Sequence, residues 1–215
     1  MMERIKGRQK KYSGMGLIEM IVSIAIFTVS IAGFSLLFIR AWKTNSYTFE
    51  MGRASTAVSQ GVNTTVSYLR KVRQGDDGTY PIVSAQSNDL VVFSDYNRDG
   101  ITERVHFYLQ SGQLKMGATV PTTGIPKTYP AGDQQTKILA SYIVNTAAEP
   151  IFYYYDANYP ADKVHNPLAI PLDVSTVRLV KILLKINIVP NKGPENMEMQ
   201  SFVEIRNLND YDRMK

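Results

Sequence analysis

A run of twenty residues without a formal charge, residues 20–39, constrains this chain more than any other feature. Its sequence is MIVSIAIFTVSIAGFSLLFI, and Arg40 follows it directly. An α-helix rises about 1.5 Å per residue, so the run would cover roughly 30 Å, the thickness of the hydrocarbon core of a bilayer. Buried core helices are usually shorter and keep a polar face. The run therefore predicts one membrane span, because no second run approaches its length.

The positive charge of the chain is concentrated before this run. Of the net charge of +5, residues 1–14 contribute +4, and the rest of the chain contributes only +1. A nearly neutral body does not favour a groove for phosphates, so we expect no nucleic-acid partner. Basic residues are denser before the span than after it, which predicts a cytoplasmic N-terminus and a C-terminal body outside the membrane.

The sequence around the end of the run differs from the cleavage site of an ordinary secretory signal. Such signals have an apolar core of about 7–15 residues followed by small residues. Here the run is longer and ends in FIRAWKT, so two possibilities remain: an uncleaved anchor, or a cleavage before the apolar run. The absence of cysteine excludes disulfides, thiolate metal sites and thiol nucleophiles.

A single carboxylate, Glu19, lies directly before the uncharged run. A lone Asp or Glu in a membrane helix costs roughly 2.5–3.5 kcal/mol on insertion scales, so it normally has a partner. The dipole at the N-terminus of a helix offsets a small part of this cost. Glu19 therefore either lies in the headgroup region or pairs with a positive group.

The order of a basic leader, Gly14, the pentapeptide MGLIE (residues 15–19) and an apolar run resembles the prepilin-type N-terminus. Type IV pilins and type II secretion pseudopilins share this N-terminus. The resemblance implies that a prepilin peptidase cuts after Gly14 and methylates the new amine of Met15. Glu19 would then be the fifth mature residue, and the Met15 amine of a neighbouring subunit would be its partner.

Within the pentapeptide, Leu17 and Ile18 also match the usual family pattern, whereas Met15 and Gly16 replace the commoner Phe-Thr. Assembly would therefore depend on Leu17, Ile18 and Glu19. The resemblance implies as partners other pilin or pseudopilin subunits, an assembly platform in the bacterial inner membrane and the lipid bilayer. The C-terminal body would lie in the periplasm, and the subunit would also occur in the filament.

The C-terminal body contains FSDYNRDGITERVHFYL, IFYYYD and VEIRNLN, and with these segments it looks most like J-type minor pseudopilins and W-type minor pilins. The expected function is a non-catalytic minor subunit of a type II secretion pseudopilus or a type IV pilus. A single-pass anchored receptor or adhesin, and an anchored enzyme with an unrecognised site, remain as alternatives.

The expected organisation has four parts: a cleaved leader (1–14), a membrane or filament-core helix half (15–40), an amphipathic helix half (41–75) and a β-rich domain (76–215). No proline precedes residue 81, so one helix can extend over residues 16–74. The segment QGDDG at residues 74–78 is a typical stop signal. Apolar residues at spacings of three or four predict the buried face of the second half: Met51, Ala54, Val58, Val62, Val66 and Leu69.

After Gly78 the apolar period changes from about 3.6 to 2, which indicates strands. We expect these strands near residues 89–95, 102–109, 112–117, 150–156, 178–189 and 200–206, with a long loop over 117–136. In the fifth strand the even positions are apolar, whereas Lys181, Lys185 and Asn187 are expected to face solvent. A long helix packed on a mostly antiparallel sheet is an α+β fold, as in pilins.

The segment DYNRDGITE, residues 95–103, resembles the first part of a calcium-binding loop. Asp95, Asn97, Asp99 and Glu103 would supply oxygen ligands at positions one, three, five and nine, with a glycine at position six. The twelfth position is His106 instead of glutamate, and no helix pattern flanks the segment, so an EF-hand is excluded. A looser calcium site and a simple hairpin turn, which favours Asp, Asn and Gly, both remain possible.

The sequence contains no recognisable catalytic motif. It has two histidines, His106 and His165, and neither lies in a nucleophile, metalloprotease, P-loop or dinucleotide-binding pattern. We therefore expect both to be structural and the protein to act by assembly, with no required cofactor.

Overall fold

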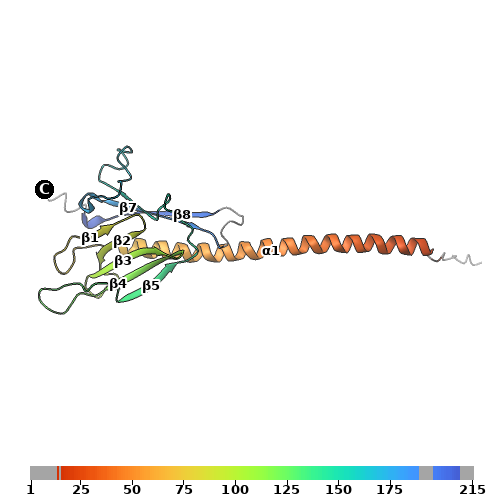
Figure 1. Ribbon diagram of the computed structural model, residues 1–215, viewed down its shortest axis with the longest axis horizontal. Coiled ribbons are helices and arrows are strands. Elements are labelled where there is room, and N and C mark those ends of the chain that lie inside the picture. The colour runs from red at the N-terminus through yellow and green to blue at the C-terminus, as the bar shows by residue number, and fades with distance from the viewer. Residues whose placement is uncertain (1–13, 15, 189–195, 209–215) are drawn as a thin grey trace, which may run out of the picture. The chain divides into compact units, whose positions relative to one another are not determined.

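The computed structural model describes residues 14, 16–188 and 196–208 of the 215-residue chain. The chain divides into two compact units, Met1–Phe49 and Glu50–Lys215. One α-helix, α1 (Leu17–Leu69), supplies most of the first unit and the start of the second. Figure 1 shows α1 as an uninterrupted helix followed by the strands of the second unit.

The first half of α1 exposes its large apolar side chains. Those between Leu17 and Trp42 are 49% to 79% exposed, and no part of the most apolar window is buried within the protein. The hydroxyls of Thr28 and Ser30 donate hydrogen bonds to the carbonyls of Ile24 and Ile26, each at 2.8 Å, and so have acceptors within the helix. The helix is long and apolar enough to span a membrane, and an apolar surface of this kind requires cover by lipid or by other helices.

The second half of α1 packs into the core of the second unit. The six residues of the predicted face are all buried there, so the amphipathic pattern is confirmed; the buried positions are Met51, Ala54, Val58, Gly61, Val62, Thr65, Val66 and Leu69. Gly61 allows a close approach to a strand, because a Cβ at this position would lie 2.3 Å from the carbonyl oxygen of Leu139.

The helix ends at Leu69, five residues before the predicted end. Val72 instead forms an isolated antiparallel bridge with Ser94, and the backbone N–H of Arg73 donates to the carbonyl of Phe93 at 3.0 Å. Arg70, Lys71 and Arg73 therefore lie beyond the last helical turn. The prediction failed because pairing with a strand distant in sequence gave these backbone groups better partners than another helical turn.

Two antiparallel sheets follow the helix. The first has five strands in the order β1 (Ile82–Ala85), β2 (Asp89–Ser94), β3 (Glu103–Gln110), β4 (Gln113–Thr119) and β5 (Gln135–Ala140), and the second has three in the order β6 (Phe152–Tyr155), β7 (Leu179–Ile186) and β8 (Met197–Glu204). Figure 1 shows β1 to β5 side by side, each paired with the next along the chain. The α+β, pilin-like fold is thus confirmed.

The second half of α1 and both sheets share one hydrophobic core. Val58, Leu69, Phe107, Tyr154 and Ile182 belong to the same buried cluster. The hydroxyl of Tyr154, on β6, donates to the carbonyl of Gln86 at 2.7 Å and so links the second sheet to the segment between β1 and β2. The expectation that Asn187 faces solvent was wrong: it lies just after the end of β7, is 4% exposed, and its N–H donates to the carbonyl of Tyr142.

Candidate functional site

The first turn of α1 carries the predicted assembly residues. The backbone N–H of Gly16 donates to Oε2 of Glu19 at 3.0 Å. Gly16 precedes the first helical residue, Leu17, and is therefore the N-cap residue. Glu19 is the third helical residue, and its side chain accepts the hydrogen bond from the N-cap N–H, as in one half of a capping box. Glu19 therefore satisfies one of the backbone donors that the start of a helix leaves unpaired.

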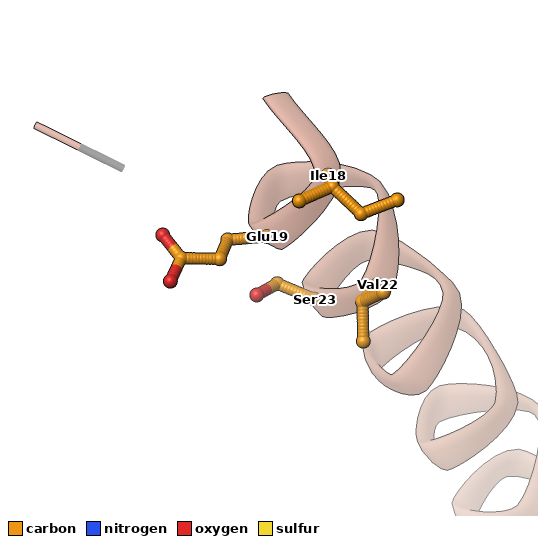
Figure 2. A pocket seen from close by; sticks show the side chains of 4 residues that line it. All are labelled: Ile18, Glu19, Val22 and Ser23. Atoms are coloured by element: carbon orange, nitrogen blue, oxygen red, sulfur yellow. The ribbon is translucent and has the colours of Figure 1, made fainter. Parts of the chain in front are cut away.

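The carboxylate of Glu19 remains exposed despite this hydrogen bond. Figure 2 shows Glu19 and Ser23, one helical turn apart, pointing to the same side of the helix. Together with Ile18 and Val22 they line a shallow, open hollow on the helix surface. A carboxylate bordered by apolar side chains is suited to binding a small cation such as a terminal amine.

The other predicted residues of this segment are also exposed. Leu17 is 79% and Ile18 is 68% exposed, and Gly14 has open space around its Cα. Met15, the predicted methylated residue, lies outside the described residues. The segment around the predicted cleavage position is thus exposed at the residues described.

The turn between β2 and β3 contains the predicted calcium ligands. Asp95 Oδ2 accepts a hydrogen bond from the N–H of Gly100 at 3.2 Å, Asn97 Oδ1 accepts from the N–H of Asp99 at 3.1 Å, and Asp99 Oδ1 accepts from the N–H of Ile101 at 2.8 Å. The side chains of the turn therefore shape its backbone. Gly100 adopts φ of +89°, a conformation that favours glycine.

Glu103, the first residue of β3, is the unusual member of this group. It is 1% exposed, and neither of its carboxylate oxygens has a hydrogen-bond partner. Burial, and then the negative charges of Asp99 and Asp95, raise the pKa of Glu103 to about 7. The backbone N–H groups of Glu103 and Tyr96 partly oppose this rise in pKa, although they do not reach the distance and angle of a full hydrogen bond to the carboxylate.

Two basic residues that follow α1 border the same turn. Lys71 donates to the carbonyl of Tyr96 at 3.2 Å, and Arg73 donates to the carbonyl of Gly100 at 2.8 Å and to the hydroxyl of Thr102 at 2.7 Å. Arg73 Nη1 also lies 3.9 Å from Asp95 Oδ2. Within the described ranges, no three His, Asp or Glu side chains are grouped so that they alone could hold a metal ion.

A third polar group, which the sequence did not reveal, surrounds His106. Its Nε2 lies 2.6 Å from Asp89 Oδ2 and its Nδ1 lies 3.1 Å from Asp133 Oδ2. The hydrogen bond with Asp89 is the main reason that the pKa of His106 is raised, and Asp133 adds to the effect against the opposing influence of burial. The two carboxylates and the imidazole connect β2, β3 and the segment before β5.

Gly117 makes the Asp133 contact possible. A Cβ at Gly117 on β4 would lie 2.1 Å from Oδ2 of Asp133, so only glycine leaves room for this carboxylate beside His106. No local pattern predicts the group, because Asp89 and Asp133 lie 17 and 27 residues from His106 along the chain. His165, the other histidine, is exposed and pairs with Asp162 at 2.7 Å.

Comparison with known proteins identifies the N-terminal segment. Residues 9–35 match the family model described as the prokaryotic N-terminal methylation motif, and this range includes Gly14, Met15 and Glu19. Searches of curated proteins and of solved structures find no significant match to the chain. In sequence, the matched range contains the predicted cleavage and methylation residues and the start of the exposed apolar helix of this α+β, pilin-like fold.

Proposed function

We propose that this chain, which has a prokaryotic N-terminal methylation motif and a pilin-like fold, is a minor pilin or pseudopilin of a type IV filament-like assembly. The observation that carries the proposal is the coincidence of the motif with the start of an apolar helix whose side chains are exposed. J-type pseudopilins and W-type minor pilins are the proposed nearest subtypes. In this role the protein is not catalytic.

In the proposed mechanism, the precursor lies in the bacterial inner membrane with its leader in the cytoplasm and its β-rich domain in the periplasm. A prepilin peptidase cuts after Gly14 and methylates the amine of Met15. The first half of α1 then leaves the lipid and is covered by helices of neighbouring subunits. The lipid and the neighbouring helices cover the same apolar side chains of α1. Transfer of the helix from the membrane to the filament therefore exposes little apolar surface to water.

Glu19 directs this transfer by electrostatic pairing. Its carboxylate leaves lipid most favourably when it meets a positive charge, and the Met15 amine of a neighbour supplies that charge. The hydrogen bond from Gly16 keeps the carboxylate at the first turn before pairing. An assembly platform in the membrane would act on the subunits once they are paired.

Processing and assembly can be tested in one series. Coexpression of the full chain with a prepilin peptidase should give an intact mass that lacks residues 1–14 and includes one added methyl group. Glu19→Ala should be cleaved normally yet be absent from the sheared filament fraction. An uncut parent chain would instead favour a single-pass anchored receptor or adhesin.

The variant Glu19→Gln separates the two roles of the carboxylate. Glutamine can still accept the hydrogen bond from Gly16, as in a capping box, but it has no charge. If pairing with an amine drives assembly, Glu19→Gln should fail to enter filaments to the same extent as Glu19→Ala. Ser30→Ala, in the same helix but outside the hollow beside Glu19, is the matched control and should assemble normally. Normal assembly of Glu19→Gln would refute the pairing mechanism.

A further inference from the structure

Three unpaired carboxylate oxygens are concentrated at the turn between β2 and β3. They are Asp95 Oδ1 and the two Oε atoms of Glu103, and among the described residues no other buried side-chain oxygen or nitrogen lacks a partner. A buried carboxylate without hydrogen bonds or a counter-charge is strongly destabilising, so native proteins rarely contain one without a ligand or a functional reason. Glu103 is such a group, whereas Asp95 is paired through Oδ2 with Gly100 and Arg73 and leaves only Oδ1 unpaired in the same turn.

The strand register brings these two residues together. Ser94 on β2 pairs with Glu103 on β3, so Asp95, the next residue, begins the turn directly beside Glu103. Gly100 donates to the other oxygen of Asp95, Oδ2, and thereby fixes the side chain with Oδ1 unpaired.

The donor atoms define the class of ligand that fits. Only oxygen atoms are unpaired, two carboxylates contribute them, and Asp99 adds further negative charge to the same turn. Hard divalent cations bind such oxygens, and calcium accepts irregular sites completed by backbone carbonyls and water. Magnesium demands a regular octahedral shell and is less suited to a turn of this kind.

We propose that the turn between β2 and β3 binds a calcium ion through Asp95 Oδ1 and the carboxylate of Glu103, with backbone carbonyls and water completing the coordination. Asn97 and Asp99 shape the turn through their hydrogen bonds to backbone N–H groups. Only two carboxylates act as side-chain ligands in this site, and the other ligands are backbone carbonyls and water. The site therefore does not require a group of three acidic side chains. It differs from an EF-hand, because strands and not helices flank it.

The positive charge of Arg73 limits the calcium affinity expected of this site. Arg73 lies 3.9 Å from Asp95 Oδ2 and already offsets part of the negative charge. With two carboxylate ligands and this competing charge, the site should resemble weak extracellular modules, with a Kd of about 10⁻⁴–10⁻³ M. Such an affinity matches a domain located outside the cytoplasm, where calcium is abundant.

The test uses the full chain in detergent micelles after treatment with a chelator. Addition of about 10 mM CaCl₂ should raise Tm by roughly 3–10 °C, as expected for a weak site in a protein of this size. The same concentration of MgCl₂ should give a clearly smaller shift. Terbium, a luminescent substitute for calcium, should show tyrosine-sensitised emission that falls in Tyr96→Phe, because Tyr96 lies within the turn.

Substitutions distinguish calcium binding from general stabilisation by salt. Glu103→Gln should abolish the calcium shift and should also raise Tm in the absence of calcium, because it removes an unpaired buried charge. Asp95→Asn provides the same test if Glu103→Gln fails to fold. Asp173→Asn is the matched control: this exposed carboxylate caps the 3-10 turn Val174–Thr176, and its loss should leave the calcium shift unchanged.

Two results would overturn the proposal. The first is a parent protein with no calcium-dependent rise in Tm and no sensitised terbium emission. The second is a calcium shift that persists in both Glu103→Gln and Asp95→Asn. Either result would leave buried water as the partner of these oxygens.

Discussion

At the scale of single residues, His106 connects three segments through two carboxylates. The imidazole is stacked on Tyr108, with ring centroids 4.5 Å apart, and lies between Asp89 and Asp133. With a carboxylate at each ring nitrogen, both nitrogens can donate only when the ring is protonated. The charged form of His106 is therefore the form that stabilises the folded protein.

This arrangement predicts a dependence of stability on pH. The pKa of His106 is raised in the folded state, first by the hydrogen bond to Asp89, so the folded protein binds the proton more tightly than the unfolded chain. The contribution to the free energy of unfolding is fully present below the unfolded pKa of about 6.5 and is lost as pH rises through the folded pKa. Replacement by His106→Gln should therefore destabilise the protein more at acidic than at alkaline pH.

Urea unfolding of the parent and of His106→Gln across this range measures the effect. The difference in free energy of unfolding between them should shrink as pH rises. A difference that stays constant with pH would show that His106 contributes only by packing.

Sequence reasoning reached some of these residues and missed others for a physical reason. Glu19 and the turn at Asp95 were found because their partners lie within five residues along the chain. The burial of Glu103 and the role of Gly117 depend on strand pairing, which spacing along the chain does not reveal. A side chain whose partners come from other strands is therefore not predictable from local motifs.

At the scale of elements, the contact between α1 and β5 depends on Gly61. A Cβ at this position would lie 2.3 Å from the carbonyl oxygen of Leu139 and 3.0 Å from the Cβ of Ala140. The first of these atoms belongs to the backbone and cannot move without shifting the strand. Gly61 therefore permits close packing of α1 against β5.

Substitution of Gly61 by valine should separate the helix from the strand. We expect Gly61→Val to lower the free energy of unfolding by about 2–4 kcal/mol, through overpacking and displacement of β5. Gly52→Ala is the matched control, because a Cβ added at Gly52 would have no heavy atom within 4 Å and alanine favours helix. Denaturant unfolding of both variants tests this, and an undiminished stability of Gly61→Val would contradict the packing argument.

The elements that sequence reasoning missed are β1 and β5. β1 has four residues, too few to establish an alternating pattern, and it lies at one edge of the five-stranded sheet. β5 lies at the other edge, and its first four residues are all exposed, so it has no apolar alternation. Both strands exist because a neighbouring strand supplies their hydrogen bonds, and the sequence of the strand itself does not encode this.

At the scale of the whole molecule, the second compact unit begins inside α1. The unit starts at Glu50, and the buried side chains of residues 51–69 complete its core. The change of apolar period predicted the α+β class, but not the division into two sheets. That division depends on long-range pairing, such as that of β6 with β7, whose sequences are separated by a long connecting segment.

Truncation at two points tests whether this part of the helix is required. A fragment of residues 41–215 should be soluble and unfold cooperatively, because it keeps the entire second unit. A fragment of residues 70–215 should not fold, because it loses the buried face that includes Val58, Val62 and Leu69. Circular dichroism and thermal unfolding distinguish the two, and a stably folded shorter fragment would show that the sheets are self-sufficient.

The connection between the end of α1 and β2 has a mechanical consequence. The carbonyl of Tyr68 accepts from Ser94, Val72 bridges to Ser94, and the N–H of Arg73 donates to Phe93. A pull on the helix would therefore be shared by several hydrogen bonds to β2. The proposed calcium turn begins at Asp95, immediately after these contacts. If the protein is a filament subunit as proposed, a bound ion would reinforce the point at which traction enters the folded domain.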